Sequence, residues 1–268
     1  MKFIRLATIA ALSTTILAGG TTAVFADEVR DVTTEGQVQF TPATDEDGDL
    51  VVIPPVGPDE GGPDVEIEPE VEGTTGPLSI VKAATMNFGS QVISNQDQVY
   101  NMVAEMQPLR ETGELVPYIS FAQVQDLRGT NAGWDLQVRM SDFESTSQNN
   151  ILTGAEISFV DSTIRYEGSN QENAPSNHEA GLTLLPNGEA RSVMTAEAGQ
   201  GAGASSVRWG NQADLNAQFE DEEIDVVENS AIQLSIPGST AKDAATYTST
   251  LTWELTTTPG EDGPETGV

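Results

Sequence analysis

The side chains in this sequence that could perform catalysis are almost all carboxylates. The 268 residues include 42 Asp and Glu against 11 Lys and Arg, with one histidine and no cysteine. The lack of cysteine excludes disulfide bonds, cysteine-ligated zinc and thiol catalysis, and one histidine gives little basis for a histidine-built metal site. That histidine, His178, lies in a turn-rich stretch, so a Ser–His–Asp centre would have to assemble around it from distant loops. The sequence therefore predicts no catalytic residues, no metal and no cofactor.

Three short stretches have some features of ligand loops but fit plainer structures better. Residues 45–49, Asp-Glu-Asp-Gly-Asp, place the glycine one position early for a calcium loop and lack its distal Glu. Residues 199–203, Gly-Gln-Gly-Ala-Gly, lack the preceding strand, following helix and distal acid of a dinucleotide site, so we expect a bulge or hairpin. The acidic run Glu220–Val227 fits either a turn of helix or a charged loop.

The charge balance limits the partners of the chain. Its formal net charge is −31 and its pI is near 4.1. Contacts to phosphate backbones and to anionic lipid headgroups need clustered Lys and Arg, so we expect neither nucleic acid nor a membrane surface as a partner.

The chain divides by composition into four segments. Residues 1–26 have the basic start, short apolar run and small-residue cleavage site of a secretory signal peptide, and the run is too short to span a bilayer. Residues 27–76 contain 15 acids, one basic residue and six prolines, which predicts a disordered, extended acidic linker. Residues 77–259 form the folded domain, and residues 260–268 are a polar tail without a sorting motif, so we expect no covalent attachment to the wall.

The domain shows the pattern of short β-strands. Apolar residues alternate with polar ones in 134–138, 232–236 and 251–255, and Gly, Asn, Pro or Ser separates most such runs. This pattern predicts an all-β class, with a sandwich or barrel-like single domain following the linker.

Two tripeptides with an acid between Trp and Leu distinguish this chain from other β-domains. Trp134-Asp135-Leu136 follows a turn that contains Asp126, Arg128 and Gly129, and Trp253-Glu254-Leu255 follows Ala245-Thr246-Tyr247 near the C-terminus. Together with Gly76-Pro77-Leu78, Asn87-Phe88-Gly89 and the glycine-rich residues 199–203, these motifs closely resemble the WxL domain family of Gram-positive surface proteins. The resemblance covers essentially the whole chain after the signal peptide.

The resemblance implies a fold and a function. It implies a secreted, non-enzymatic protein held non-covalently on the cell wall, with peptidoglycan as ligand and a role in adhesion or surface-complex assembly. It also implies a membrane-anchored partner protein encoded in the same gene cluster. Two alternatives stay open: a module that reaches the wall only through such a partner, and a glycan hydrolase that uses two carboxylates.

The alternation also places the motif side chains. Residues i and i+2 of a strand share a face, so Trp134 lies on the same side as Leu136, and Trp253 on the same side as Leu255. Because aliphatic residues extend both faces, we expect tryptophans in the core; an aromatic platform for wall sugars is the alternative. Asp135 and Glu254 are then expected to be exposed.

Overall fold

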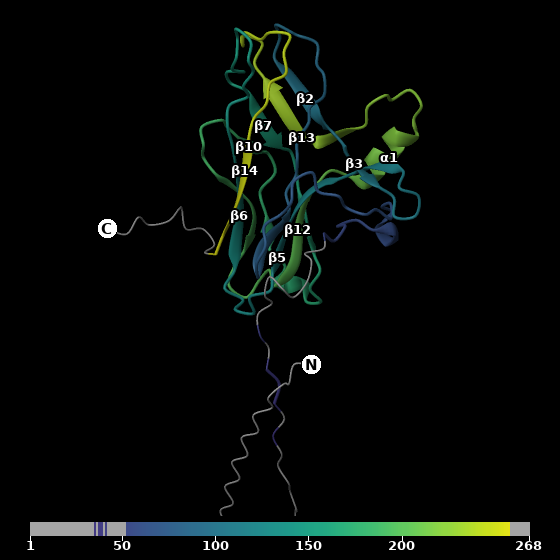
Figure 1. Ribbon diagram of the computed structural model, residues 1–268, viewed down its shortest axis with the longest axis vertical. Coiled ribbons are helices and arrows are strands. Elements are labelled where there is room, and N and C mark those ends of the chain that lie inside the picture. The colour runs from purple at the N-terminus through teal and green to yellow at the C-terminus, as the bar shows by residue number, and fades with distance from the viewer. Residues whose placement is uncertain (1–34, 36, 40, 42–51, 258–268) are drawn as a thin grey trace, which may run out of the picture. The chain divides into compact units, whose positions relative to one another are not determined.

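The computed structural model describes residues 35, 37–39, 41 and 52–257 (Figure 1). Residues 35 and 37–39, in the first of two compact units, are exposed and without regular secondary structure. Residues 52–257 belong to the second unit, and the following description concerns them alone. The expected signal peptide and the stretch 45–49 lie outside the described residues.

The fold is built from three four-stranded antiparallel sheets and a hairpin. The first sheet has the order β1 (Leu78–Lys82), β5 (Ser120–Asp126), β12 (Gly203–Trp209), β8 (Thr163–Tyr166). The second has the order β10 (Leu182–Leu184), β7 (Glu156–Phe159), β13 (Glu228–Ile236), β2 (Gln98–Val103). The third has the order β14 (Leu251–Thr256), β6 (Trp134–Met140), β11 (Arg191–Ala196), β9 (Ser176–Asn177). The hairpin pairs β3 (Glu105–Pro108) with β4 (Leu115–Tyr118), and the helices are α1 (Gln212–Glu220) and two short 3-10 turns, Pro58–Glu60 and Gln171–Asn173.

The inner faces of the three sheets share one hydrophobic core, which confirms the all-β class. Each sheet contributes alternate residues, as a two-residue side-chain period requires. The central members are Val124 and Val207 from the first sheet, Phe159, Ile232 and Leu234 from the second, and Trp134, Leu136 and Val138 from the third.

A second, smaller core changes the boundary of the linker. Val56, Val65 and Ile67 are buried against Tyr118 and Phe121 on the outer side of the first sheet. In Figure 1 this purple segment lies beside β3 and α1, to the right of the sheets. An extended linker was expected over all of 27–76, and for residues 52–67 that expectation is wrong. A few aliphatic residues between prolines are sufficient to anchor this segment, because they pack against Tyr118, Ile119 and Phe121.

Side chains far along the chain supply hydrogen bonds to the backbone of this segment. The Gln123 amide accepts from the N–H of Ile53 at 3.0 Å and donates to its carbonyl at 2.9 Å. The Tyr118 hydroxyl accepts from the N–H of Val56 at 2.9 Å and donates to its carbonyl at 2.7 Å. These pairings satisfy backbone groups that burial would otherwise leave without partners.

Most of the acidic run Glu220–Val227 is a loop, and a helix that ends at Glu220 precedes this loop. Helix α1 ends at Glu220, and residues 221–227 contain turns and bends only. The Asn211 side chain caps the helix by accepting from the N–H of Ala213 at 3.0 Å. Within the helix Leu215 is the buried apolar residue, so the sequence carries no amphipathic pattern by which to predict it.

We predict that Val65→Ala lowers the free energy of unfolding by about 1–3 kcal/mol, because Val65 is completely buried and its loss leaves a cavity. Val71→Ala, at a side chain that is 72% exposed, is the matched control and should change it by less than about 0.5 kcal/mol. Urea denaturation of the two purified variants measures the difference. Equal effects would show that residues 52–67 do not contribute to the fold.

Candidate functional site

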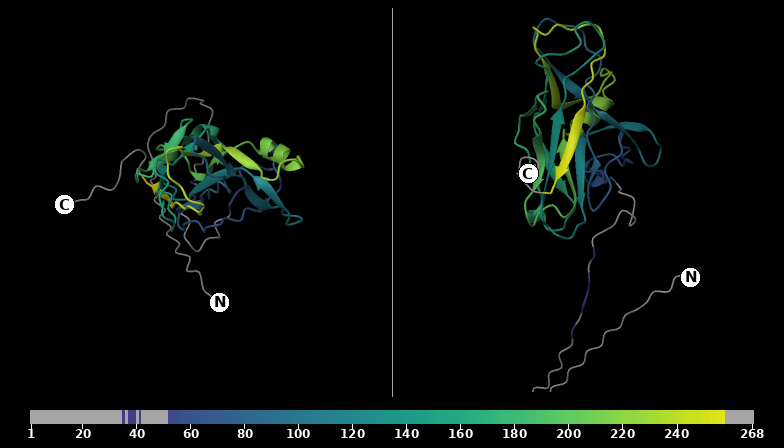
Figure 2. Two further views of the ribbon diagram at one scale, coloured as in Figure 1. Left: turned by 90° about the horizontal axis from the view of Figure 1, so that it is seen from above. Right: turned by 60° about the vertical axis from the view of Figure 1, so that its left-hand side comes forward.

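The two Trp-x-Leu motifs lie side by side on strands β6 and β14, which are neighbours in the third sheet (Figure 2). Leu255 pairs with Leu136, and Trp253 pairs with Val138. Trp134 and Leu136 are completely buried, whereas Trp253 and Leu255 are half-buried and pack against the main core from the sheet's edge. The ring of Trp253 lies 6.2 Å from that of Trp209. The core interpretation therefore holds for both tryptophans, most completely for Trp134.

Trp134 makes a specific contact with the glycine-rich stretch 199–203. Its Nε1 donates to the carbonyl oxygen of Gly201 at 3.1 Å. Gly201 has φ = +71°, and a Cβ there would lie 2.7 Å from Trp134 Nε1 and 2.6 Å from the Cβ of Ala196. A bulge or hairpin was expected here; the stretch instead connects β11 to β12, which belong to different sheets, so it is not a hairpin. Trp134 thus holds a connection between sheets, and only glycine fits against its ring.

Asp135 is buried on the opposite face of the same strand, contrary to the expected exposure. Its carboxylate accepts from the hydroxyls of Ser192 and Thr195, both at 2.7 Å, and from the amide of Gln137 at 2.6 Å. Ser192 and Thr195 are three residues apart and would point to opposite faces of a regular strand. The β11–β6 register shifts between Ser192 and Met194, and this bulge turns both hydroxyls toward Asp135. The middle acid of the first motif is therefore a structural acceptor.

The middle acid of the second motif lies in the expected environment. The side chain of Glu254 is 41% exposed and forms an ion pair with Arg139 on β6, at 3.0 Å. This pair crosses the two motif strands on their outer face. An exposed pair of this kind contributes only about 0–1 kcal/mol.

The turn before the first motif is closed by Asp126 and Arg128. The guanidinium binds the carboxylate through two atoms, at 2.9 and 2.7 Å, and also donates to the carbonyl of Gly133 at 2.8 Å. Asp126 is 4% exposed, so the pair is largely buried. Gly129 lies in the turn with φ = +68°. The flanking motif therefore fixes the start of β6.

These contacts make the motif region a framework. Trp134 and Asp135 are buried and hydrogen-bonded within the protein, and Trp253 is half-buried. Most of the motif region is therefore closed to a ligand.

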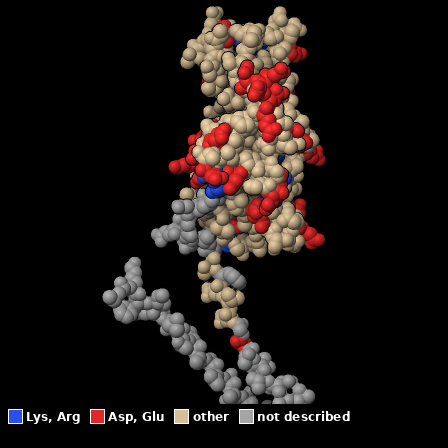
Figure 3. Space-filling view, turned by 90° about the vertical axis from the view of Figure 1, so that its right-hand side faces the viewer, with Lys and Arg blue, Asp and Glu red and all other residues tan. Residues whose placement is uncertain are grey.

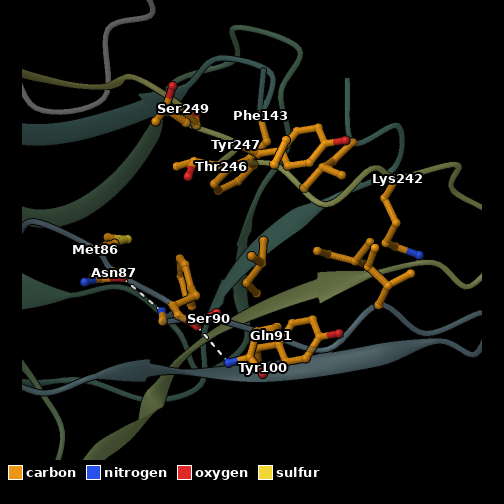
Figure 4. Close-up of a pocket in the computed structure, with 18 of the residues that line it drawn as sticks. Met86, Asn87, Ser90, Gln91, Tyr100, Phe143, Lys242, Thr246, Tyr247 and Ser249 are labelled. Carbon is orange, nitrogen blue, oxygen red and sulfur yellow. Dashed lines mark hydrogen bonds between the residues drawn. The ribbon is translucent and has the colours of Figure 1, made fainter. Parts of the chain in front are cut away.

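A pocket with a volume of about 730 Å³ opens at the other end of β6, where long loops gather in Figure 1. Residues 86–93 and 242–251 form its walls. Aliphatic side chains from β7, β13 and the preceding loop form its floor: Leu152, Ile157, Leu234 and Ile236. Figure 4 shows Gln91 and Tyr100 on one side of the hollow and Phe143 and Tyr247 on the other. Its size is typical of a small-molecule site.

Two charged side chains line the pocket, and both are engaged. The Asp243 carboxylate accepts from the backbone N–H and the side-chain amide of Asn149, at 2.7 and 2.8 Å, and these bonds lower the pKa of Asp243. The Lys242 ammonium donates to the carbonyls of Ser94 and Thr240, at 2.9 and 3.1 Å. Sequence reasoning did not predict this pocket. The signal that could have found it is the position of Asn87-Phe88-Gly89 and Ala245-Thr246-Tyr247, two motif flanks that line it.

His178 is part of an aromatic cluster with Trp209 and Phe159. The indole N–H of Trp209 donates to His178 Nε2 at 2.9 Å, so Nδ1 carries the proton and lies 2.7 Å from the carbonyl of Glu179. Burial lowers the pKa of His178, although the Glu179 carbonyl and the charge of Asp161 raise it. Both ring nitrogens are occupied, which leaves neither for a nucleophile.

Within the described residues no cluster of three or more His, Asp or Glu is placed to hold a metal ion. The helices of the same part of the chain are too short or too polar to cross a bilayer.

We predict that Gly201→Ala destabilises the fold by about 1–3 kcal/mol more than Gly199→Ala, because its methyl group would overlap the Trp134 ring. Both glycines have positive φ, +71° and +92°, but a Cβ at Gly199 meets no atom within 4 Å. The backbone strain that alanine adds is thus similar in both variants. The difference between their free energies of unfolding, measured by chemical denaturation, therefore reports the contact with Trp134. An equal loss in both would refute the role of Trp134 at this connection.

We predict that His178 contributes stability at neutral pH that is lost on acidification. Because its folded pKa is lowered, the contribution is fully present above the unfolded value of about 6.5 and is lost as the pH falls through the folded value. In His178→Gln this part of the pH dependence of stability should be absent, whereas the part that comes from carboxylates should be unchanged. Thermal melts of both proteins from pH 7.5 to 5 measure the difference, and parallel curves would contradict the assignment.

Comparison with known proteins identifies the domain. A family described as "WxL domain surface cell wall-binding" matches residues 27–259, which include all three sheets and both motif strands. No curated protein and no solved structure matches the chain. The family match places the protein at the cell wall and cell surface. The chain therefore belongs to the WxL family of surface domains that bind the cell wall.

Proposed function

We propose that this protein is exported and retained non-covalently on peptidoglycan of a Gram-positive wall through its C-terminal WxL domain. There it acts in adhesion or in assembling surface complexes, including one with a membrane-anchored protein. The observation that carries the proposal is the match of a cell-wall-binding family to residues 27–259. The framework character of the motif residues agrees with a domain that presents a rigid binding surface.

The distribution of carboxylates favours binding over hydrolysis. Glycoside hydrolysis generally needs two carboxyl groups that flank the bond, one of them protonated. The pocket lining contains only the carboxylate of Asp243, and its lowered pKa keeps it ionised. Burial raises the pKa of Glu105, but Glu105 is ion-paired with buried Lys82 at 2.8 Å and does not line the pocket. Neither group has the partner that a hydrolase requires.

The surface charge sets conditions on wall binding. Acidic side chains are spread over the face in Figure 3, from its upper to its lower part, and few Lys and Arg are visible there. A chain with a net charge of −31 is repelled by an anionic wall over about 8–10 Å at physiological salt. Binding must therefore depend on short-range contacts, and protonation of carboxylates should strengthen it.

We predict that the purified protein co-sediments with protein-free sacculi and that the bound fraction rises as the pH falls from 8 to 4. Repulsion decreases as surface carboxylates are protonated, which gives the direction of the change. Turbidity of the same suspension reports hydrolysis. Constant turbidity with stable co-sedimentation is the expected result.

Three other outcomes would count against the proposal. A fall in turbidity would indicate a hydrolase. Co-sedimentation only with membrane-containing envelopes would indicate attachment through a protein partner instead of peptidoglycan. A bound fraction that is constant or lower at acidic pH would refute the electrostatic argument.

A further inference from the structure

We propose that the pocket between residues 86–93 and 242–251 binds a neutral N-acetylated amino sugar of a wall glycan, an inference that rests on the proposed function. It names the part of the wall that the domain recognises and the residues that recognise it.

The pocket is built from groups suited to a sugar ring. Aromatic rings lie on both sides of the hollow, with Tyr100 opposite Phe143 and Tyr247 (Figure 4). Aromatic faces pack against the apolar C–H faces of a saccharide. At the rim, Asn87 accepts from the N–H of Gly89, and Gln91 and Ser249 donate to the carbonyls of Phe88 and Ser141. The Asn87 NH₂ and the Gln91 carbonyl oxygen, together with the hydroxyls of Ser90 and Thr246, can bond hydroxyl groups of the sugar.

The aliphatic floor points to an acetylated sugar. Leu152, Ile157, Leu234 and Ile236 lie at the bottom, each less than 9% exposed in the fold. An unsubstituted hexose would place hydroxyl groups there without partners, which costs free energy. An acetamido group instead places a methyl on the aliphatic floor and leaves an N–H and a carbonyl for the rim amides.

The charge of the lining selects a neutral ligand. Asp243 and Lys242 are the two charged residues of the lining, and both are held by hydrogen bonds within the protein. A ligand carboxylate or ammonium would therefore meet no unused opposite charge in the pocket. This disfavours the charged ends of wall peptides.

The rest of the described surface offers little for an anionic wall polymer. Seven of the eight Lys and Arg in residues 52–257 already bond to acidic side chains or carbonyls of the protein: Lys82, Arg110, Arg128, Arg139, Arg165, Arg208 and Lys242. An anionic polymer would have to break these pairs. The neutral pocket is therefore the better site on this domain for a wall component.

Isothermal titration calorimetry with two soluble tetrasaccharides tests the inference on the full purified protein. The probes are β-1,4-linked tetramers of N-acetylglucosamine and of glucose, which differ by the acetamido groups. We expect the acetylated tetramer to bind at least tenfold more tightly than the glucose tetramer. Equal affinities, or binding of neither tetramer, would overturn the inference.

Substitutions locate the binding. Tyr100→Ala removes one aromatic wall at a half-buried side chain, and Ser90→Trp places a large ring at an exposed position of the lining. We expect each to weaken binding of the acetylated tetramer at least tenfold and to reduce co-sedimentation with sacculi. Phe219→Ala is the matched control, because Phe219 is a 46% exposed aromatic outside the pocket, and its binding should be unchanged. Ser90→Trp keeps the test valid if Tyr100→Ala fails to fold.

The results separate this inference from the proposed function. If wild-type protein binds sacculi but both pocket variants bind them equally well, the pocket assignment is wrong and wall binding stands. If an isolated, sugar-free wall peptide competes with sacculi for the pocket, the ligand class is wrong. If the wild-type protein does not co-sediment with sacculi, the proposed function itself is wrong.

Discussion

The start of strand β6 is buried on both faces, at Trp134 and Asp135, and this constraint determines much of the surrounding structure. On its inner face the indole N–H of Trp134 needs an acceptor, which the carbonyl of Gly201 supplies. On its outer face the carboxylate of Asp135 would be costly to bury without donors, and three neutral donors reach it. The first requirement selects a glycine in the connection between β11 and β12. The second selects the bulge in β11. Two adjacent residues of one motif thus specify the geometry of two distant segments.

The sequence predicted the parts of the fold that depend on local pattern. Alternation placed Trp134 and Leu136 on one face of a strand and led to the all-β class. It did not show what covers the other face, which is why Asp135 was expected to be exposed. Asp135 can be buried because a bulge in β11 brings the hydroxyl of Ser192, 57 residues further along the chain, to its carboxylate. Residues 52–67 were assigned to the linker for a similar reason, because the polar groups that satisfy their backbone lie on β4 and β5.

The pocket could not be predicted for a different reason. Its lining comes from several separated stretches of sequence, and most of these residues are uncharged and of common type. No spacing rule connects Tyr100 to Phe143 or Tyr247. The flanking motifs Asn87-Phe88-Gly89 and Ala245-Thr246-Tyr247 were identified only as signs of resemblance, yet both line the cavity. In this fold the motifs therefore have two physical roles: the Trp-x-Leu residues stabilise the framework, and the flanks shape the pocket at the other end of β6.

The strongly negative charge of the chain explains why wall binding would need a pocket that is separate from the Trp-x-Leu framework. With so few basic residues, the fold uses nearly all of them internally; Arg208, for example, binds the Pro55 carbonyl at 3.0 Å and helps to hold residues 52–62 on the first sheet. The remaining acids repel anionic polymers and keep the protein soluble. Long-range electrostatics therefore cannot attract this domain to an anionic wall. Specific recognition must come from close contacts, and among the described residues the pocket between 86–93 and 242–251 offers a concave lining that is uncharged apart from Lys242 and Asp243.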